Sequence, residues 1–361
     1  MEICRFLAVN GVVSHISNAP PVTTFLESHP GAYTTTRTHN NASTLLFWNR
    51  HLSRLADSIR ILSLTQQNPN ALSLSPVHSF INTSMANLLP IALDKRRDGE
   101  ELAITALLSS SLGNLNENEG FCGNLGSQVL GVSVHIGFYV PPPFGDRDNG
   151  ARLALVGKGR DLAAAKYSDW VRIRKPLERF RPPSVTELLL SNDGDRILEG
   201  CVTNFFVVRP KESDEVRIHE SGSSQSFEVQ TAPISDGVLP GVLRKLVIEV
   251  CSKIGIPLRE VAPSWSEHET WEEAFITNSL RMVQHVEKIQ VPSSWRLMQQ
   301  SKSWEEIIWM EKHFEEGPGR ITAIIQEFDG ESMDLDPEAS FIVLQHPQMI
   351  ILWSILNPKH K

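Results

Sequence analysis

A lysine follows a run of three alanines at residues 163–165, where its ammonium group would be less hydrated than on an ordinary protein surface. Removal from water disfavours the charged form of an amine, so Lys166 would be more available as a nucleophile toward a carbonyl group. Lysines beside alanines are more often surface residues whose methylene stems lie along apolar neighbours. The segment by itself therefore leaves both interpretations open.

One acidic residue, Glu199, stands in the apolar and small-residue run Leu198–Val208. An ionised carboxylate in such a strand is costly unless a cationic group pairs with it. Glu199 therefore either faces water from an edge strand or holds a proton on a bound heterocycle.

Two further segments have residue types that could bind a ligand. Residues 239–244, Leu-Pro-Gly-Val-Leu-Arg, are typical of a helix start, where unpaired backbone N–H groups and the helix dipole attract anions. Asn278 and Ser279 follow an apolar run that is typical of a strand. Polar residues in that position can contact a ligand, or they can cap a helix.

Taken together, these segments resemble the class IV, or fold-type IV, pyridoxal-phosphate aminotransferases. That family includes branched-chain aminotransferase, D-amino-acid aminotransferase and aminodeoxychorismate lyase. The resemblance covers roughly residues 30–325 and is strongest over residues 199–206, at Thr231 and over residues 239–244. The 33-residue step from Lys166 to Glu199 also suits the family, and the His-x-x-Arg-Leu segment at residues 51–55 is a looser match.

The resemblance implies pyridoxal 5′-phosphate as the cofactor. Lys166 matches the lysine that forms the internal aldimine, and Glu199 matches the acid that keeps the pyridine nitrogen protonated, so that the ring acts as an electron sink. The positions that match the phosphate-binding residues are Arg54, the backbone amides of Val242 and Leu243, Asn278 and Ser279. No metal site is expected, because the histidines form no pair with clear ligand spacing.

Residues 31–37 match the strand that lines the substrate pocket in the family, so the expected substrate-binding residues are Tyr33, Thr35 and Arg37. Transaminases often carry a glutamate where this chain has Thr34, and the Tyr-Thr-Thr-x-Arg string is closer to that of aminodeoxychorismate lyase. A threonine hydroxyl at this place could transfer a proton during elimination. Threonine also favours strands without any catalytic role.

The chain departs from the family pattern on the substrate side. Asp169 replaces the usual asparagine, Val171 stands where some members have a tyrosine, and the chain is longer between Phe206 and Thr231. The segment from Lys166 to Arg181 carries six basic and two acidic residues, a net charge of +4. Such a segment either steers a carboxylate substrate or forms a solvated face.

Composition limits the class of protein. The 361 residues suffice for about two domains, and 41% hydrophobic with 21% charged residues excludes a disordered or fibrous chain. The net charge of −8 argues against a general nucleic-acid binder. Four scattered cysteines exclude a disulfide framework and a zinc ribbon, and they suit a reducing compartment. Without a signal-peptide pattern or a long apolar run, the sequence predicts a cytoplasmic protein.

Periodicity predicts the elements that position these residues. Strands are expected at 6–14, 33–38, 102–108 and 129–140, and helices at 48–63 and 74–94. In the second half, strands at 188–190 and 197–208 flank an Asp-Gly turn, and a helix begins near Pro240. This order indicates an α+β fold. The resemblance implies a fold-type IV enzyme with a small N-terminal α/β domain and a larger C-terminal domain with a β-barrel-like core.

The chain is predicted to divide at a proline-rich stretch. A small N-terminal domain covers residues 1–140, an interdomain linker 141–150, a pyridoxal-phosphate-binding domain 151–327, and a tail of unknown structure 328–361. Two polar tracts interrupt the pattern, at 109–127 and at 210–226, and the second is expected to be a surface insertion.

The leading hypothesis is an aminotransferase that moves an amino group between a branched-chain or D-amino acid and a 2-oxo acid. One alternative is an aminodeoxychorismate lyase that releases pyruvate and 4-aminobenzoate. Another is a catalytically silent protein that keeps the fold as a binding module. The resemblance implies a homodimer, and neither a nucleic acid nor a membrane is an expected partner.

Overall fold

The computed structural model describes residues 4–16, 18–65, 75–111, 122–125, 128–142, 147–211, 227–327 and 342–343. The described residues fall into two compact units. The first contains the described residues up to Pro141, the segment Ala165–Ile173 and the strand at 342–343. The second contains the described residues within Pro142–Ala164 and Arg174–Met333. The predicted C-terminal domain includes residues 165–173, which here cluster with the first unit. The domain borders themselves stay a prediction.

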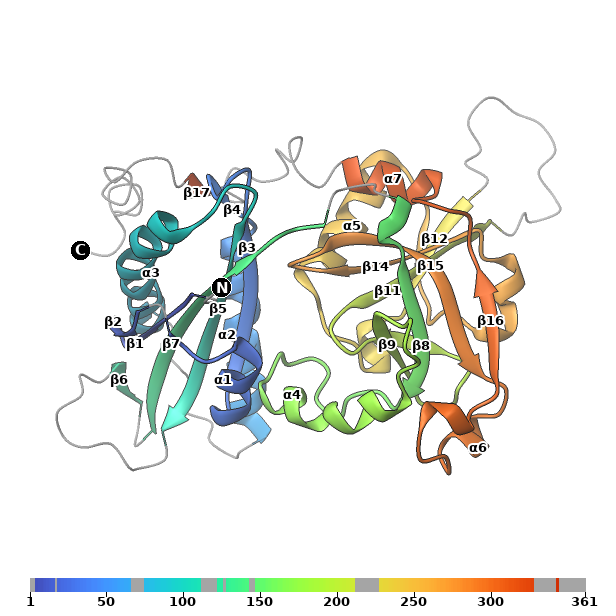
Figure 1. The fold of residues 1–361 in the computed structure, drawn as a ribbon, viewed down its shortest axis with the longest axis horizontal. Coiled ribbons are helices and arrows are strands. Elements are labelled where there is room, and N and C mark those ends of the chain that lie inside the picture. Colours follow the sequence, from blue (N-terminus) through green and yellow to red (C-terminus); the bar gives the residue numbers. More distant parts are fainter. Residues whose placement is uncertain are drawn as a thin grey trace. The chain divides into compact units, whose positions relative to one another are not determined.

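The first unit is an antiparallel sheet with helices packed on it (Figure 1). The strand order is β17-β4-β3-β5-β7-β1-β2, and β6 pairs with β7. The strands are β1 (Arg5–Val9), β2 (Val12–His15), β3 (Ala32–His39), β4 (Thr44–Leu45), β5 (Glu101–Ser111), β6 (Cys122–Leu125), β7 (Gln128–Tyr139) and β17 (Ile342–Val343). The helices are α1 (Val22–Ser28), α2 (Trp48–Thr65), α3 (Ser75–Lys95) and α4 (Asp169–Ile173).

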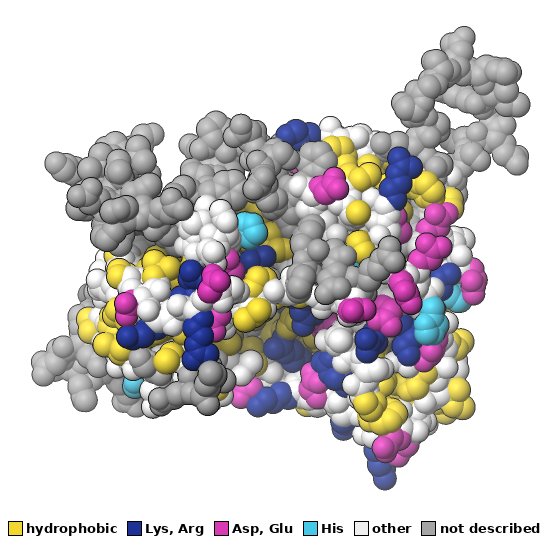
Figure 2. Space-filling model, turned by 45° about the horizontal axis from the view of Figure 1, so that its top comes forward, with side chains coloured by type: hydrophobic (Ala, Val, Ile, Leu, Met, Phe, Trp, Pro, Cys, Tyr) yellow, Lys and Arg dark blue, Asp and Glu magenta, His cyan; other side chains and the backbone are white. Residues whose placement is uncertain are grey.

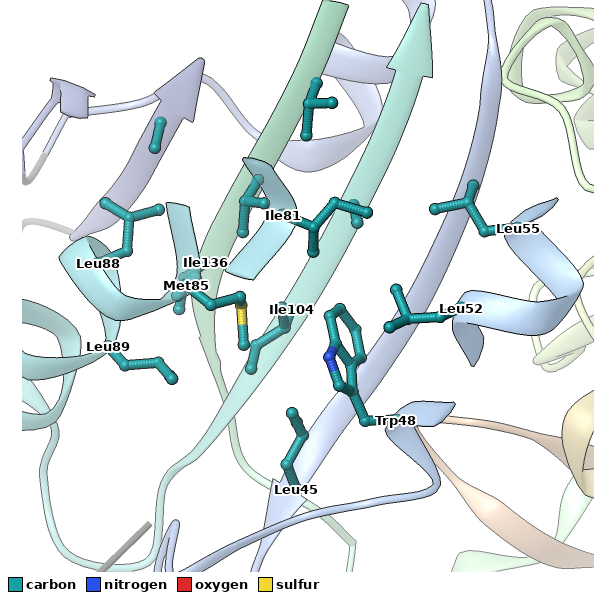
Figure 3. Close-up of a cluster of buried hydrophobic side chains, with 14 of the residues drawn as sticks. Leu45, Trp48, Leu52, Leu55, Ile81, Met85, Leu88, Leu89, Ile104 and Ile136 are labelled. Carbon is teal, nitrogen blue, oxygen red and sulfur yellow. The ribbon is translucent and has the colours of Figure 1, made fainter. Parts of the chain in front are cut away.

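Helices α2 and α3 cover one face of this sheet because their apolar residues recur at every third or fourth position. Leu52 and Leu55 of α2 lie with Ile81 and Met85 of α3 around Ile104 of β5 (Figure 3). Full burial of each such side chain contributes roughly 1.5–3 kcal/mol. The predicted helices at 48–63 and 74–94 are therefore confirmed, and α2 is held firmly beside β3.

Strand pairing in the second unit closes a ring of six strands, and Figure 1 shows their arrangement. The ring runs β8-β9-β10-β11-β14-β15 and returns from β15 to β8. These strands are β8 (Ala151–Gly157), β9 (Glu187–Ser191), β10 (Ile197–Gly200), β11 (Asn204–Pro210), β14 (Glu273–Asn278) and β15 (Met282–Pro292). Strands β12 (Phe227–Thr231), β13 (Leu258–Glu260) and β16 (Trp309–His313) extend the sheet beyond the ring. The predicted α+β class and barrel-like core are confirmed.

Successive side chains along the strands point alternately into the barrel and toward the helices outside it. Every second residue, including Leu153, Phe205 and Ile276, belongs to the interior cluster. Phe206 and Phe275 point the other way and pack against α5 (Val242–Ile254) and α7 (Arg320–Glu327). A short helix, α6 (Trp295–Met298), follows β15.

Two predicted strands are wrong in their continuity. The run 6–14 is a hairpin of β1 and β2, because Asn10 and Gly11 adopt φ values of 50° and 83° that suit a tight Asn-Gly turn. The run 197–208 divides into β10 and β11, because Gly200 donates its N–H to the Thr203 carbonyl at 2.9 Å and closes a turn. The Asp-Gly turn between β9 and β10 is confirmed, with Gly194 at a φ of 83°.

Several predicted segments fall largely outside the described residues. They are most of the tract 109–127, residues 143–146 of the predicted linker, most of the insertion 210–226, and the tail 328–361 apart from β17. On the face shown in Figure 2, acidic and basic side chains of the described residues are interspersed. Within the described ranges, no helix combines the length and the apolar character needed to cross a membrane.

Candidate active site

The backbone of Lys166 is attached to β3 and to α2 within the first unit. Tyr33 donates its N–H to the Lys166 carbonyl at 2.9 Å, and Lys166 donates its N–H to the Ser58 hydroxyl at 3.0 Å. The half-buried Lys166 ammonium lies 4.7 Å from the centre of the Tyr33 ring. The aromatic face attracts the cation and excludes water from one side of it. The structure thus brings together two residues that the sequence assigned to the cofactor and to the substrate.

On the other face of β3, the buried side chains of Thr34 and His51 hold Arg54 in place. Its Nη2 donates to the Thr34 hydroxyl at 2.8 Å, and that hydroxyl lies 2.9 Å from His51 Nδ1. Arg54 Nη2 also approaches His51 Nδ1 at 3.4 Å. A guanidinium only donates hydrogen bonds, so the contact with Arg54 favours Nδ1 as the accepting nitrogen of His51.

His51 is fully buried and neutral. Burial lowers its pKa well below 6.5, and the positive charges of Arg54 and Lys166 lower the pKa further. A neutral imidazole does not repel the neighbouring guanidinium. The Thr34 hydroxyl, considered as a proton donor for elimination, is engaged with Arg54 and His51.

The three predicted substrate residues share one face of β3, because side chains alternate along a strand. Tyr33 and Arg37 are buried and Thr35 is half-buried. The Thr35 hydroxyl pairs with that of Thr105 at 2.9 Å, and Arg37 Nη1 donates to the Thr38 carbonyl at 3.1 Å. Thr34 lies on the opposite face of the strand, toward α2.

In the second unit, Glu199 is 1% exposed and bound to a cation. Arg160 donates to its Oε1 from Nε at 2.9 Å and from Nη2 at 2.5 Å. Oε2 accepts from the Leu239 N–H at 3.0 Å and from Asn204 Nδ2 at 3.3 Å. The edge-strand interpretation is wrong, and the cationic partner required by burial is Arg160. Sequence reasoning did not single out Arg160, whose only signal was that a buried glutamate needs one such partner.

The predicted helix start is the beginning of α5. Val242 and Leu243 are its first residues, and the N-cap residue Gly241 has no side chain to cap them. A Cβ atom at Gly241 would lie 2.1 Å from Asn204 Oδ1, so the glycine allows this close approach. An uncapped first turn of this kind can donate backbone N–H groups to an anion.

The turn after β14 contains the remaining predicted residues. Asn278 Oδ1 accepts from the N–H groups of Leu280 at 3.0 Å and Arg281 at 2.8 Å, so this side chain shapes the turn, and Ser279 lies half-buried within it. Thr277, which sequence reasoning missed, has a buried hydroxyl without a hydrogen-bond partner among the described residues.

Cross-strand pairing puts Thr277 on the same face of the sheet as Glu199. Glu199 lies opposite Asn204, and Asn204 lies opposite Thr277, so all three side chains share one face of the sheet. This face combines the carboxylate of Glu199, which is paired with Arg160, with a buried hydroxyl that has no hydrogen-bond partner among the described residues. Among the described residues, no group of three or more metal-ligating side chains is arranged to hold a metal.

Comparisons with known proteins find a related sequence family and similar folds. Residues 141–289 match the sequence model of the amino-transferase class IV family. No curated protein sequence matches the chain. Solved structures of branched-chain aminotransferases are similar over about nine-tenths of the chain.

The structure from Thermoproteus uzoniensis with norvaline has a TM-score of 0.57 and 17% identity, covering 90% of this chain and 92% of that chain. The holo-form structure from Thermobaculum terrenum, which contains pyridoxal phosphate, has a TM-score of 0.57 and 15% identity, with coverage of 91% and 93%. The structure from Escherichia coli has a TM-score of 0.58 and 15% identity, with coverage of 90% and 93%. At these identities the likeness shows the fold, which is that of fold-type IV aminotransferases. The sequence match assigns residues 141–289 to the amino-transferase class IV family.

Proposed function

We propose that the protein is a pyridoxal-phosphate-dependent aminotransferase that moves an amino group between an amino acid and a 2-oxo acid. The observation that carries the proposal is the buried carboxylate of Glu199, which Arg160 compensates and the Leu239 amide orients. Such a carboxylate is suited to a protonated heterocyclic nitrogen. The family match supports the same cofactor, since class IV aminotransferases use pyridoxal phosphate.

The residues of this chain would hold the cofactor at three places. Glu199 would accept a hydrogen bond from the pyridine N–H, replacing the 3.3 Å bond from Asn204, whose amide keeps its 3.0 Å bond to the Leu239 carbonyl. Lys166 would bind the cofactor covalently through Nζ. The phosphate would be bound by Arg54, the amides of Val242 and Leu243, and the turn of Asn278 and Ser279.

When bound, pyridoxal phosphate supplies an electron sink that stabilises negative charge at the substrate Cα. Lys166 Nζ would move a proton between that Cα and C4′ of the cofactor, acting as both general base and general acid. The Tyr33 ring, 4.7 Å away, would limit the hydration of the lysine. Thr34 and His51 would keep Arg54 in place for the phosphate.

Small aliphatic amino acids are the proposed substrates. The branched-chain aminotransferase from Thermoproteus uzoniensis was crystallised with norvaline, and we extend that class to this chain. Branched-chain and D-amino acids are the first donors to test, with Tyr33, Thr35 and Arg37 as the proposed substrate-binding residues. We further propose a homodimer and a cytoplasmic location.

The test begins with the absorbance that pyridoxal phosphate acquires when it is bound to a lysine. We expect this band in the wild-type protein and in Lys158→Ala, which removes an exposed lysine of the second unit, and we expect it to be lost in Lys166→Ala. A panel of L- and D-amino acids with 2-oxo acids then measures amino transfer.

Three outcomes would count against the proposal. A wild-type protein without the band, or a band that survives Lys166→Ala, removes the cofactor assignment. Release of 4-aminobenzoate from aminodeoxychorismate without transfer to any 2-oxo acid replaces the transferase with the lyase. A bound cofactor without turnover of any substrate would favour the silent binding module.

A further inference from the structure

Four buried polar atoms of the second unit lie near the turn that joins β10 to β11 and have no hydrogen-bond partner among the described residues. They are Glu187 Oε2, Thr203 Oγ1, Arg281 Nη1 and Arg174 Nη1. The side chains of Glu187 and Thr203 are 2% and 5% exposed. A buried polar atom without a partner destabilises a protein, so this group is one that a ligand would complete.

Gly200 shows how close these groups are. A Cβ atom at Gly200 would lie 2.1 Å from Thr203 Oγ1 and 3.3 Å from Glu187 Cδ, so the hydroxyl and the carboxyl converge on one point. Glu187 Oε2 lies 3.8 Å from Arg281 Nη1, which is an ion-pair distance without a hydrogen bond. Arg174 lies close enough to lower the pKa of Glu187 electrostatically.

The charges in this cluster favour an anion. Arg281 and Arg174 contribute two positive charges and Glu187 at most one negative charge. The nearby Arg181 is already engaged, because its Nε and Nη2 donate to Glu178 and its Nη1 donates to the Val185 carbonyl. Burial raises the pKa of Glu187 in spite of the arginines, which further reduces its negative charge. An ammonium group would be repelled here.

The cluster adjoins both cofactor segments of this unit. Gly200 follows Glu199 directly, and Arg281 closes the turn of Asn278 and Ser279 by donating its N–H to Asn278 Oδ1. The Arg281 side chain is 30% exposed, and Val202, within the turn, is 37% exposed. A small molecule can therefore reach the cluster from solvent.

We propose that Arg281 and Arg174 bind a carboxylate group of the substrate, with the Thr203 hydroxyl as an additional donor. This proposal rests on the proposed function, in which both the amino acid and the 2-oxo acid carry a carboxylate. Guanidinium groups bind carboxylates by charge-assisted hydrogen bonds, and the Nη1 groups of these arginines have no hydrogen-bond acceptor among the described residues. Glu187 is the specificity element, because its carboxyl donates to the ligand when protonated and repels it when ionised.

The test is calorimetric titration of the cofactor-loaded protein with unreactive probes. Isovalerate and glutarate have a carboxylate but neither an amino nor an oxo group, and isovaleramide is the neutral control. We expect the acids to bind and the amide to bind at least about tenfold more weakly, the difference that one charge-assisted hydrogen bond makes. Arg281→Met and Arg174→Met should each raise the Kd of the acids about 10- to 100-fold.

Two further variants distinguish an effect on ligand binding from a general loss of structure. Glu187→Gln keeps the shape and removes the charge, so it should bind the acids as tightly as the wild type or more tightly. Arg181→Met removes an arginine that also influences Glu187 electrostatically but whose donors are engaged elsewhere, so it should leave the Kd within about twofold. Circular dichroism and the bound-cofactor absorbance of each variant verify that the fold is intact.

The proposal is overturned if neither acid binds the wild type, if the amide binds as well as the acid, or if Arg281→Met and Arg181→Met behave alike. Weaker acid binding in Glu187→Gln together with tighter binding in Arg281→Met would instead assign a cationic ligand. If the wild type shows no bound-cofactor absorbance, the proposed function fails separately. The same titration of the cofactor-free protein then still decides whether the arginines bind carboxylates.

Discussion

Arg160→Met should destabilise the protein strongly, even without the cofactor. The guanidinium and the Glu199 carboxylate have side-chain exposures of 5% and 2%, and two hydrogen bonds join them. Methionine fills a similar volume but leaves the carboxylate without its cation. Removing one partner of a buried pair is costly because the other charge stays buried.

The size of the effect follows from this geometry. At a charge separation of about 4 Å and an effective dielectric constant of about 20, the attraction is about 4 kcal/mol. Removing one partner of a buried ion pair typically costs about 3–5 kcal/mol, which agrees. For a unit of this size, roughly 2–4 °C of Tm corresponds to 1 kcal/mol, so we expect Tm to fall by roughly 8–16 °C.

The assay is urea and thermal unfolding of the cofactor-free protein, followed by tryptophan fluorescence and circular dichroism. The matched control is Arg196→Met, because Arg196 pairs with Asp193 through Nε at 3.0 Å on the surface, with side-chain exposures of 67% and 42%. The control should unfold like the wild type. The double variant Arg160→Met/Glu199→Gln should be more stable than Arg160→Met, since it no longer buries an unpaired charge.

The reasoning would be refuted by an Arg160→Met variant as stable as the Arg196→Met control. It would also be refuted if the double variant lost the sum of the two single effects, because the two side chains would then contribute independently. Either result would mean that the buried pair does not control the stability of this unit.

Three more predictions concern single residues. Burial and the charges of Arg54 and Lys166 hold the pKa of His51 well below 6.5, so below pH 6.5 the unfolded protein binds a proton that the folded protein does not. The wild type should therefore lose more stability toward acid than His51→Gln does. Urea unfolding on both sides of pH 6.5 measures this difference. Gly241→Ala places a Cβ 2.1 Å from Asn204 Oδ1, so pyridoxal phosphate should bind at least about tenfold more weakly in absorbance titrations. Burial raises the pKa of Cys201 and of Cys251 to about 12, so a thiol reagent should label them only after unfolding; rapid labelling of the native protein would contradict this.

Local sequence patterns predicted many of the helices, strands and turns. The 3,4 spacing of Leu52, Leu55 and Ile59 predicted α2, and the Asp-Gly pair predicted the turn between β9 and β10. Both patterns depend only on residues that are close in the sequence, so they can be recognised without knowledge of the rest of the molecule. The Asn10-Gly11 hairpin was readable by the same rule, and its two strands were nevertheless predicted as one.

The sequence marked Lys166 and Glu199 as candidates, because a lysine among alanines and an acid among apolar residues are chemical exceptions in their own segments, and the family resemblance then assigned their expected roles. Which partners they meet was decided by tertiary structure. Arg160 binds Glu199 across 39 residues, and Thr34 reaches Arg54 across 20. The closed barrel and the packing of α2 on the sheet bring these side chains together, and no local pattern specifies which of 34 basic residues will compensate a given buried acid. The cluster of Glu187 and Arg281, 94 positions apart, exists only because β9 and the turn after β14 belong to the same barrel.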